Sequence, residues 1–90
     1  MPPLTMRVWG SGRGKIVHHV QTNGTEGVRP DSSVFAAVTE VDHQNFQTPF
    51  IGNARVFVCN VAPGAGYVDV WVHIDWDSDL PYRLTLLIVD

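Results

Sequence analysis

The chain has 90 residues, a net charge of -3 and only six Lys and Arg residues. This length predicts one domain over residues 1–90, with room for a single core. The shortage of basic residues argues against a nucleic-acid partner held by phosphate neutralisation, and no apolar run approaches the roughly 20 residues that span a bilayer. A single cysteine rules out an intramolecular disulfide.

In chain order, β-branched and aromatic residues alternate between clusters of Gly, Pro, Asn and Asp, which predicts strands and almost no helix. The expected strands are LTMRVWG (4–10), KIVHHVQT (15–22), SVFAAVTEVD (33–42), NARVFVCNV (53–61), YVDVWVHIDW (67–76) and YRLTLLIVD (82–90). Six short strands at this spacing are typical of an antiparallel β-sandwich or small barrel. We therefore expect an all-β, six-stranded antiparallel β-sandwich.

Alternate residues of a strand point to the same face, so the fifth strand divides into two sets. The set expected in the core is Val68, Val70, Val72, Ile74 and Trp76. The opposite set mixes large aromatics with acids, and it is expected to face solvent or another subunit: Tyr67, Asp69, Trp71, His73 and Asp75.

The sixth strand is apolar on both of its faces. Leu84, Leu86 and Ile88 alternate there with Leu87 and Val89. A monomer would expose one of these faces to water, so the pattern indicates a second face covered by another subunit. We expect a symmetric assembly.

The stretch HIDWDSDLPY, residues 73–82, gathers acids and aromatics where a strand ends. Asp75, Asp77 and Asp79 follow the D-x-D-x-D spacing that begins an EF-hand calcium loop. The motif then fails, because Leu80 stands where glycine is required and no Glu closes the loop. These three aspartates remain a secondary calcium candidate beside a solvated acidic loop, and no other metal or cofactor is expected.

Other catalytic and metal motifs fail on their spacing. GSGRGK lacks the first glycine of a phosphate-binding loop, because Trp9 occupies that position. His18 and His19 are adjacent in a strand and point to opposite faces, so they do not form a metal pair. Cys59 lies inside a strand with no helix end to activate it, and is expected to be a small core or interface residue. We expect no enzymatic activity.

The residue types around Trp76 suit a sugar-sized pocket. Tyr82 and Asp77 lie close to Trp76 in sequence, and Arg55 and Asn53 enter from the neighbouring strand. Arg presents a rigid fork of donors and Asp an acceptor for sugar hydroxyls. Trp and Tyr offer an apolar plate with a polar tip for the ring C–H groups. The plain alternative is that Trp76 belongs to the core and Tyr82 merely begins a strand.

Several segments of residues 33–90 are similar to those of one family. VFAAVTEVD is similar to an apolar strand ending in a hydrophobic residue and Asp, and NARVFVCNVAPGAGY to an N-x-R-V strand followed by a Pro-Gly turn and an aromatic residue. HIDWDSDLPY keeps a Tyr six residues after its Trp, and GKI (14–16) is similar to an N-terminal G-x-I strand. In these segments the chain resembles the H-type lectins, the snail-agglutinin type that binds N-acetylgalactosamine.

The resemblance implies a six-stranded sandwich that forms homotrimers, sometimes stacked into hexamers, with sugar bound in clefts between subunits. Arg55 and Trp76 would contact the sugar, Asp77 and Tyr82 would complete the wall, and Asn53 would support them. The segment NGTEG (23–27) is the candidate for the family's polar sugar-contacting loop.

Two functions follow as hypotheses. The first is a non-enzymatic, multivalent protein that binds galactose- or N-acetylgalactosamine-type glycans and copies of itself. The alternative is a structural interaction protein on the same fold, such as a phage virion or tail component, with Tyr67, Trp71 and the last strand holding other virion proteins. The first residues, MPPLTMRVWG, show no signal-peptide pattern. The expected location is extracellular or virion-associated, without membrane insertion or nucleic acid.

Overall fold

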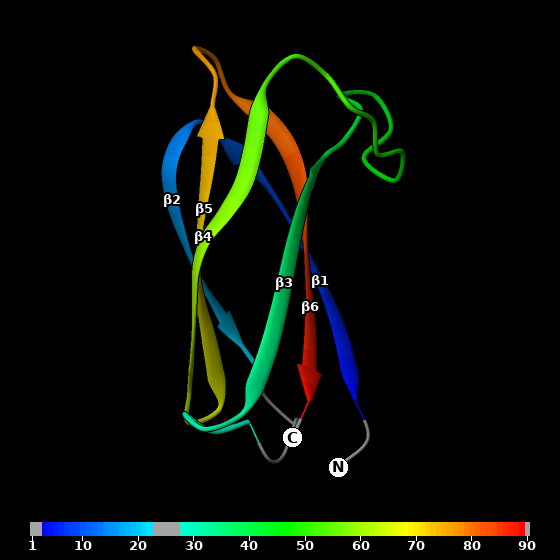
Figure 1. Cartoon of the computed structure of the whole chain (residues 1–90). Coiled ribbons are helices and arrows are strands. Elements are labelled where there is room, and N and C mark those ends of the chain that lie inside the picture. The colour runs from blue at the N-terminus through cyan, green and yellow to red at the C-terminus, as the bar shows by residue number, and fades with distance from the viewer. Residues whose placement is uncertain (1–2, 23–27, 90) are drawn as a thin grey trace.

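A computed structural model describes residues 3–22 and 28–89 of the chain. Over these residues the protein is all-β, with six antiparallel strands in two three-stranded sheets and no helix (Figure 1). The strands are β1 (Leu4–Gly12), β2 (Gly14–Gln21), β3 (Ser33–Glu40), β4 (Arg55–Gly64), β5 (Tyr67–Asp75) and β6 (Leu80–Val89). The six expected strands are confirmed, with shifts of a few residues at their ends.

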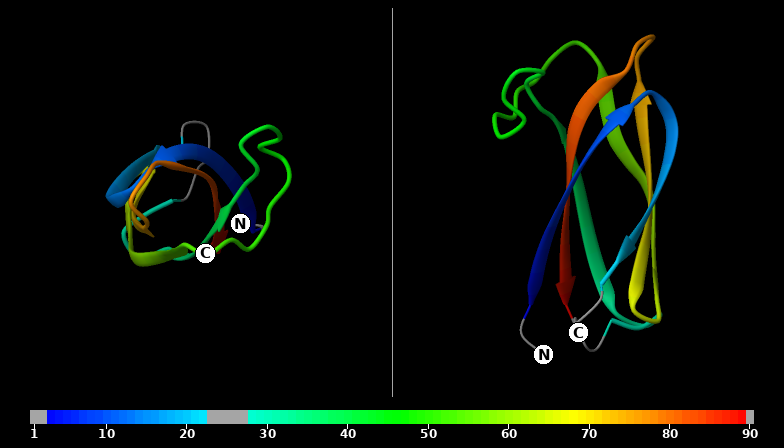
Figure 2. Two further views of the ribbon diagram at one scale, coloured as in Figure 1. Left: turned by 90° about the horizontal axis from the view of Figure 1, so that it is seen from above. Right: turned by 180° about the vertical axis from the view of Figure 1, so that it is seen from behind.

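The two sheets have the strand orders β1-β6-β3 and β2-β5-β4, and the chain passes repeatedly from one to the other (Figure 2). Gly14, where the chain leaves β1 and enters β2, has a φ of 71°. In the β4–β5 hairpin, Gly66 has a φ of 81°. Both values lie in the left-handed region, which glycine adopts without steric cost. No helix in the described ranges has the length and apolar character needed to cross a membrane.

The core lies between the sheets and is built mainly by their central strands, β5 and β6. Its fully buried aliphatic side chains from these strands are Val68, Val70, Val72, Ile74, Leu84, Leu86 and Ile88. Each such side chain stabilises the fold by about 1.5–3 kcal/mol through removal from water. The alternation predicted for both strands is confirmed at these positions, and the arrangement is that of a β-sandwich-like fold.

Trp76 departs from this alternation, and the prediction that it belongs to the core is wrong. β5 ends at Asp75, and the Trp76 backbone N–H donates to the Ile74 carbonyl at 3.0 Å. This short-range bond bends the chain out of the strand, so the side chain no longer follows the inward positions. Its indole is 42% exposed.

A β-bulge interrupts β4 between Val58 and Asn60. Before the bulge Val56 and Val58 pack on the core, and after it Val61 does so. The extra residue is Cys59, which is exposed. Of its two expected places the core is therefore wrong, because the bulge leaves the residue outside the paired register; the interface stays a prediction.

Candidate functional site

The predicted sugar-binding residues Arg55 and Asn53 lie at one end of the sheet β2-β5-β4. Arg55 begins β4 opposite Asp75, the last residue of β5. Its Nε and Nη2 donate to Asp75 Oδ2 at 3.0 and 2.7 Å, although the Arg55 side chain is 80% exposed. An exposed ion pair adds little stability, but this one orients the guanidinium. Among the described residues, no acceptor binds Nη1.

Trp76 and Asp77 continue the chain directly from Asp75, so they leave the same end of the sheet. Both are exposed, as is Asn53. The Asp77 carbonyl accepts a hydrogen bond of 2.6 Å from Arg13 Nη1, which ties this turn to the β1–β2 connection. The structure thus places four of the five predicted residues, Asn53, Arg55, Trp76 and Asp77, on exposed surface at the β4 start and the β5 end.

Tyr82 lies apart from this group, in the sheet β1-β6-β3, and points inward. It is 1% exposed, and its hydroxyl is hydrogen-bonded to His18 Nε2 of the opposite sheet. The rings meet edge-on, with centroids 5.5 Å apart at 79°. Tyr82 has the same parity as Leu84 and Leu86, so the alternation that buries those leucines buries Tyr82 as well. In the single chain it does not form the exposed sugar-contacting wall that the family resemblance implies.

Burial changes the acid–base behaviour of this pair. Partial removal from water disfavours charge, so it raises the pKa of the Tyr82 hydroxyl and lowers the pKa of the His18 imidazole. Space around the phenol is tight, since a Cβ at Gly10 would lie 2.5 Å from Tyr82 Oη. The pair bridges the two sheets and belongs to the packing of the interior.

The calcium candidates do not converge. The Asp75 carboxylate is bound by Arg55, and Asp79 Oδ1 lies 3.4 Å from Arg13 Nε. In the part of the chain that the structure describes, no three His, Cys, Asp or Glu side chains gather where they would share a metal ion. His18 faces the interior and His19 faces outward toward Asp69, as the alternation predicts.

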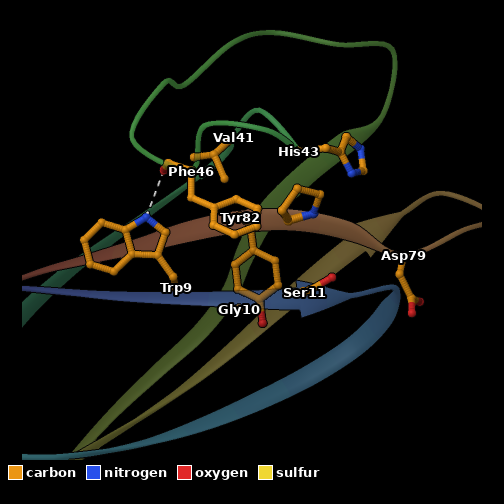
Figure 3. A pocket seen from close by; sticks show the side chains of 9 residues that line it. Trp9, Gly10, Ser11, Val41, His43, Phe46, Asp79 and Tyr82 are labelled. Atoms are coloured by element: carbon orange, nitrogen blue, oxygen red, sulfur yellow. Dashed lines mark hydrogen bonds between the residues drawn. The ribbon is translucent and has the colours of Figure 1, made fainter.

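A cavity of about 430 Å³ opens elsewhere, over one end of the sheet β1-β6-β3 (Figure 3). Its lining residues come from β1, the β3–β4 connection, the β5–β6 turn and the start of β6: Trp9, Gly10, Ser11, Val41, His43, Phe46, Asp79, Pro81 and Tyr82. Trp9 Nε1 donates to the Phe46 carbonyl at 3.0 Å across the opening. Of the predicted sugar contacts, Tyr82 lines this cavity.

The sequence analysis missed the cavity and its aromatic residues. One signal was present: the loop HQNFQTPFIG (43–52) carries two phenylalanines among polar residues. An exposed aromatic side chain in a polar loop often marks a binding surface. The partner of that loop, Trp9, lies 37 positions from Phe46 in sequence, and nothing local to either residue indicates the contact.

Comparisons with protein-family models, with curated proteins and with solved structures find no match to this chain. The resemblance to H-type lectins therefore rests on the quoted segments, and it stays a prediction. The proposed polar loop NGTEG (23–27) lies outside the described residues.

Proposed function

We propose that this chain is a non-enzymatic, multivalent carbohydrate-binding protein that recognises galactose- or N-acetylgalactosamine-type glycans. On this proposal it is a single-domain sandwich that assembles into a homotrimer or hexamer, and sugar binds in clefts between subunits. Arg55, Trp76 and Asp77 contact the sugar, and Asn53 supports them. Tyr82 lies apart from this surface, as a packing residue of the interior of the same subunit.

One observation carries the proposal: an oriented guanidinium and an exposed indole leave the same end of one sheet. Asp75 holds two of the Arg55 nitrogens, while Nη1 stays available to an incoming hydroxyl. Trp76 follows Asp75 at once and offers apolar area to the C–H face of a sugar ring. A fixed guanidinium with a free donor, at the same end of the sheet as an aromatic plate, is the combination that distinguishes sugar recognition from a solvated acidic loop.

The assembly is supported by an apolar pair on the outer face of the sheet β1-β6-β3. Phe35 and Leu87 lie opposite each other in the β3–β6 register, and they are 62% and 39% exposed. Such a pair is stabilised when a second subunit covers it. Multivalency matters here because sugar hydroxyls exchange water for protein at small net gain. Linking several weak sites raises the apparent affinity by about 10² or more on a glycan-covered surface.

The alternative function, a structural protein that binds other virion proteins, is favoured by the outer face of the sheet β2-β5-β4. Lys15 Nζ lies 4.5 Å from the ring centroid of Trp71, and Trp71 Nε1 is buried without an acceptor among the described residues. A partner protein that displaced the groups covering this nitrogen would supply the acceptor it lacks.

A glycan array separates the two functions. We expect the wild-type protein to bind galactose-type glycans and Trp76→Ala to lose that binding. Phe57→Ala is the matched control, because Phe57 is a similarly exposed aromatic on the outer face of the same sheet. Light scattering on all three proteins should give a mass that is a multiple of three subunits.

Three results would contradict the proposal. An array on which neither the wild type nor Phe57→Ala binds any glycan favours the structural role. Equal glycan binding by wild type and Trp76→Ala, at unchanged mass, would place recognition away from the β5 end. A monomeric mass removes the basis for both the lectin and the virion assembly.

A further inference from the structure

The cavity lined by Trp9, Phe46 and Tyr82 is distinct from the proposed intersubunit cleft. None of Arg55, Trp76, Asp77 and Asn53 lines it. Its volume of about 430 Å³ falls within the range of roughly 300–1,000 Å³ that small-molecule sites occupy. All of its walls come from one chain, so it needs no partner subunit to be complete.

The walls of this cavity are fixed by their own hydrogen bonds. Trp9 Nε1 holds the Phe46 carbonyl, which fastens the β3–β4 connection to β1 (Figure 3). Within that connection the Asp42 N–H donates to the Thr48 carbonyl and the Thr48 N–H to the Asn45 carbonyl, each at 3.0 Å. A site ordered before its ligand arrives loses less conformational entropy on binding.

The lining is amphipathic, with apolar groups below and polar groups at the edge. Val41 and Tyr82 are fully buried and form the floor, and the exposed aromatic rings of Trp9 and Phe46 stand beside it. The polar side chains that border the cavity are those of Ser11, His43 and Asp79. A ligand that fits would carry one apolar face and a polar edge.

The charge at the edge points to a neutral ligand. The Asp79 carboxylate lies 3.4 Å from Arg13 Nε, so it already faces an opposite charge. Because the charges of Asp79 and Arg13 offset each other, a charged ligand would gain little electrostatic free energy by binding there. A pyranose ring is neutral, presents C–H groups on one face, and carries hydroxyls around its edge. Asp79 accepts from such hydroxyls, while Ser11 can both donate and accept.

We propose that this cavity is a second carbohydrate site, which takes one hexopyranose unit against Trp9 and Phe46. Each subunit then carries two sugar-binding surfaces, one complete within the chain and one completed by a neighbour. This inference goes beyond the proposed function, because it requires neither Arg55 nor an assembly.

The test uses the three tryptophans as separate reporters. The ¹⁵N-labelled full chain is titrated with methyl β-galactoside, methyl α-N-acetylgalactosaminide and methyl α-glucoside, and the indole N–H signals are followed by NMR. Trp9 reports on the cavity and Trp76 on the proposed cleft. At least one glycoside should shift the Trp9 signal to saturation.

Phe46→Ala should weaken the affinity in that titration by about tenfold, because the loss of an aromatic contact worth about 1.4 kcal/mol corresponds to that factor. This variant keeps the backbone carbonyl that Trp9 holds. Phe50→Ala is the matched control, since Phe50 is an exposed phenylalanine of the same connection that borders a different hollow. Asp79→Asn provides a second variant, which removes the carboxylate at the cavity edge and keeps a side chain of similar size.

Phenol is titrated in parallel as an apolar probe. A Trp9 signal unmoved by all three glycosides overturns the proposal, and movement by phenol alone would make the cavity an apolar aromatic site. Equal affinities for wild type, Phe46→Ala and Asp79→Asn also overturn it. The two proposals fail separately: movement of Trp9 without Trp76 supports the cavity and contradicts the cleft, and the reverse contradicts the cavity alone.

Discussion

Replacement of Tyr82 by Phe distinguishes an interior residue from a sugar contact. The change removes only the hydroxyl that is hydrogen-bonded to His18 across the two sheets. Loss of one partner from a buried hydrogen bond costs about 1–3 kcal/mol. Because His18 is half-buried, water compensates in part, and we expect a loss of about 1–1.5 kcal/mol in the free energy of unfolding.

Urea denaturation measures this loss directly. A domain of this size has an m-value of about 1 kcal/mol per M in urea, so the midpoint should fall by about 1 M with m unchanged. Tyr67→Phe is the matched control: Tyr67 is the other tyrosine, lies on the outer face of β5 and stacks on His19. Its variant should unfold within a few tenths of 1 M of the wild type.

Glycan binding by Tyr82→Phe should remain close to that of the wild type, because the variant keeps the ring that lines the cavity and removes only the hydroxyl that is bonded to His18. The reasoning is refuted if the variant keeps its urea midpoint but loses glycan binding, because the hydroxyl would then be a surface contact to sugar. That outcome would return Tyr82 to the role implied by the family resemblance.

Three further predictions concern the fold. Leu84→Ala, at a fully buried position of β6, should lower the free energy of unfolding by about 2–5 kcal/mol in a urea titration, and no change there would place the core elsewhere. Because burial lowers the pKa of His18 below 6.5, the unfolded chain binds the proton more tightly. Stability should therefore be complete above the unfolded pKa of 6.5 and fall as the pH drops through that value toward the folded pKa. The urea midpoint should decrease on mild acidification, and His18→Gln should flatten that dependence. Gly66→Ala should cost about 1–2 kcal/mol through its φ of 81° alone, since a Cβ there meets no atom within 4 Å. Equal thermal stability of Gly66→Ala and wild type would contradict the hairpin conformation.

The sequence predicted the strands well because alternation is a local signal. The residues of one strand suffice to identify its inward-facing set, and the structure buries all four of them: Val68, Val70, Val72 and Ile74. Where the strand ended was not visible. The alternation therefore assigned Trp76 to the inward-facing set, whereas the chain bends out of the sheet directly before it.

Tyr82 shows a different failure. Its parity with Leu84 already indicated an inward side chain, but the family resemblance assigned it to an exposed wall. The partner that holds it, His18, lies 64 positions away on the other sheet. Such a pairing depends on how the two sheets face each other, which no local pattern encodes.

The cavity and the proposed assembly also depend on contacts that the alternation within a single strand does not show. The hydrogen bond between Trp9 and Phe46 joins a strand to a loop that sequence periodicity does not describe. Phe35 and Leu87 are exposed in the single chain, and their cover by a second molecule, which the proposed assembly requires, is a property of two molecules. The residue types thus led to the hypothesis of sugar binding, while the positions of the side chains came from the fold.

A crystal structure of the protein with methyl α-N-acetylgalactosaminide tests the central claim most directly. The proposal predicts sugar density in a seam between subunits, with the indole of Trp76 against the ring and the guanidinium of Arg55 within hydrogen-bonding distance of a hydroxyl. Sugar-free seams, with both side chains open to solvent at saturating glycoside, would contradict it.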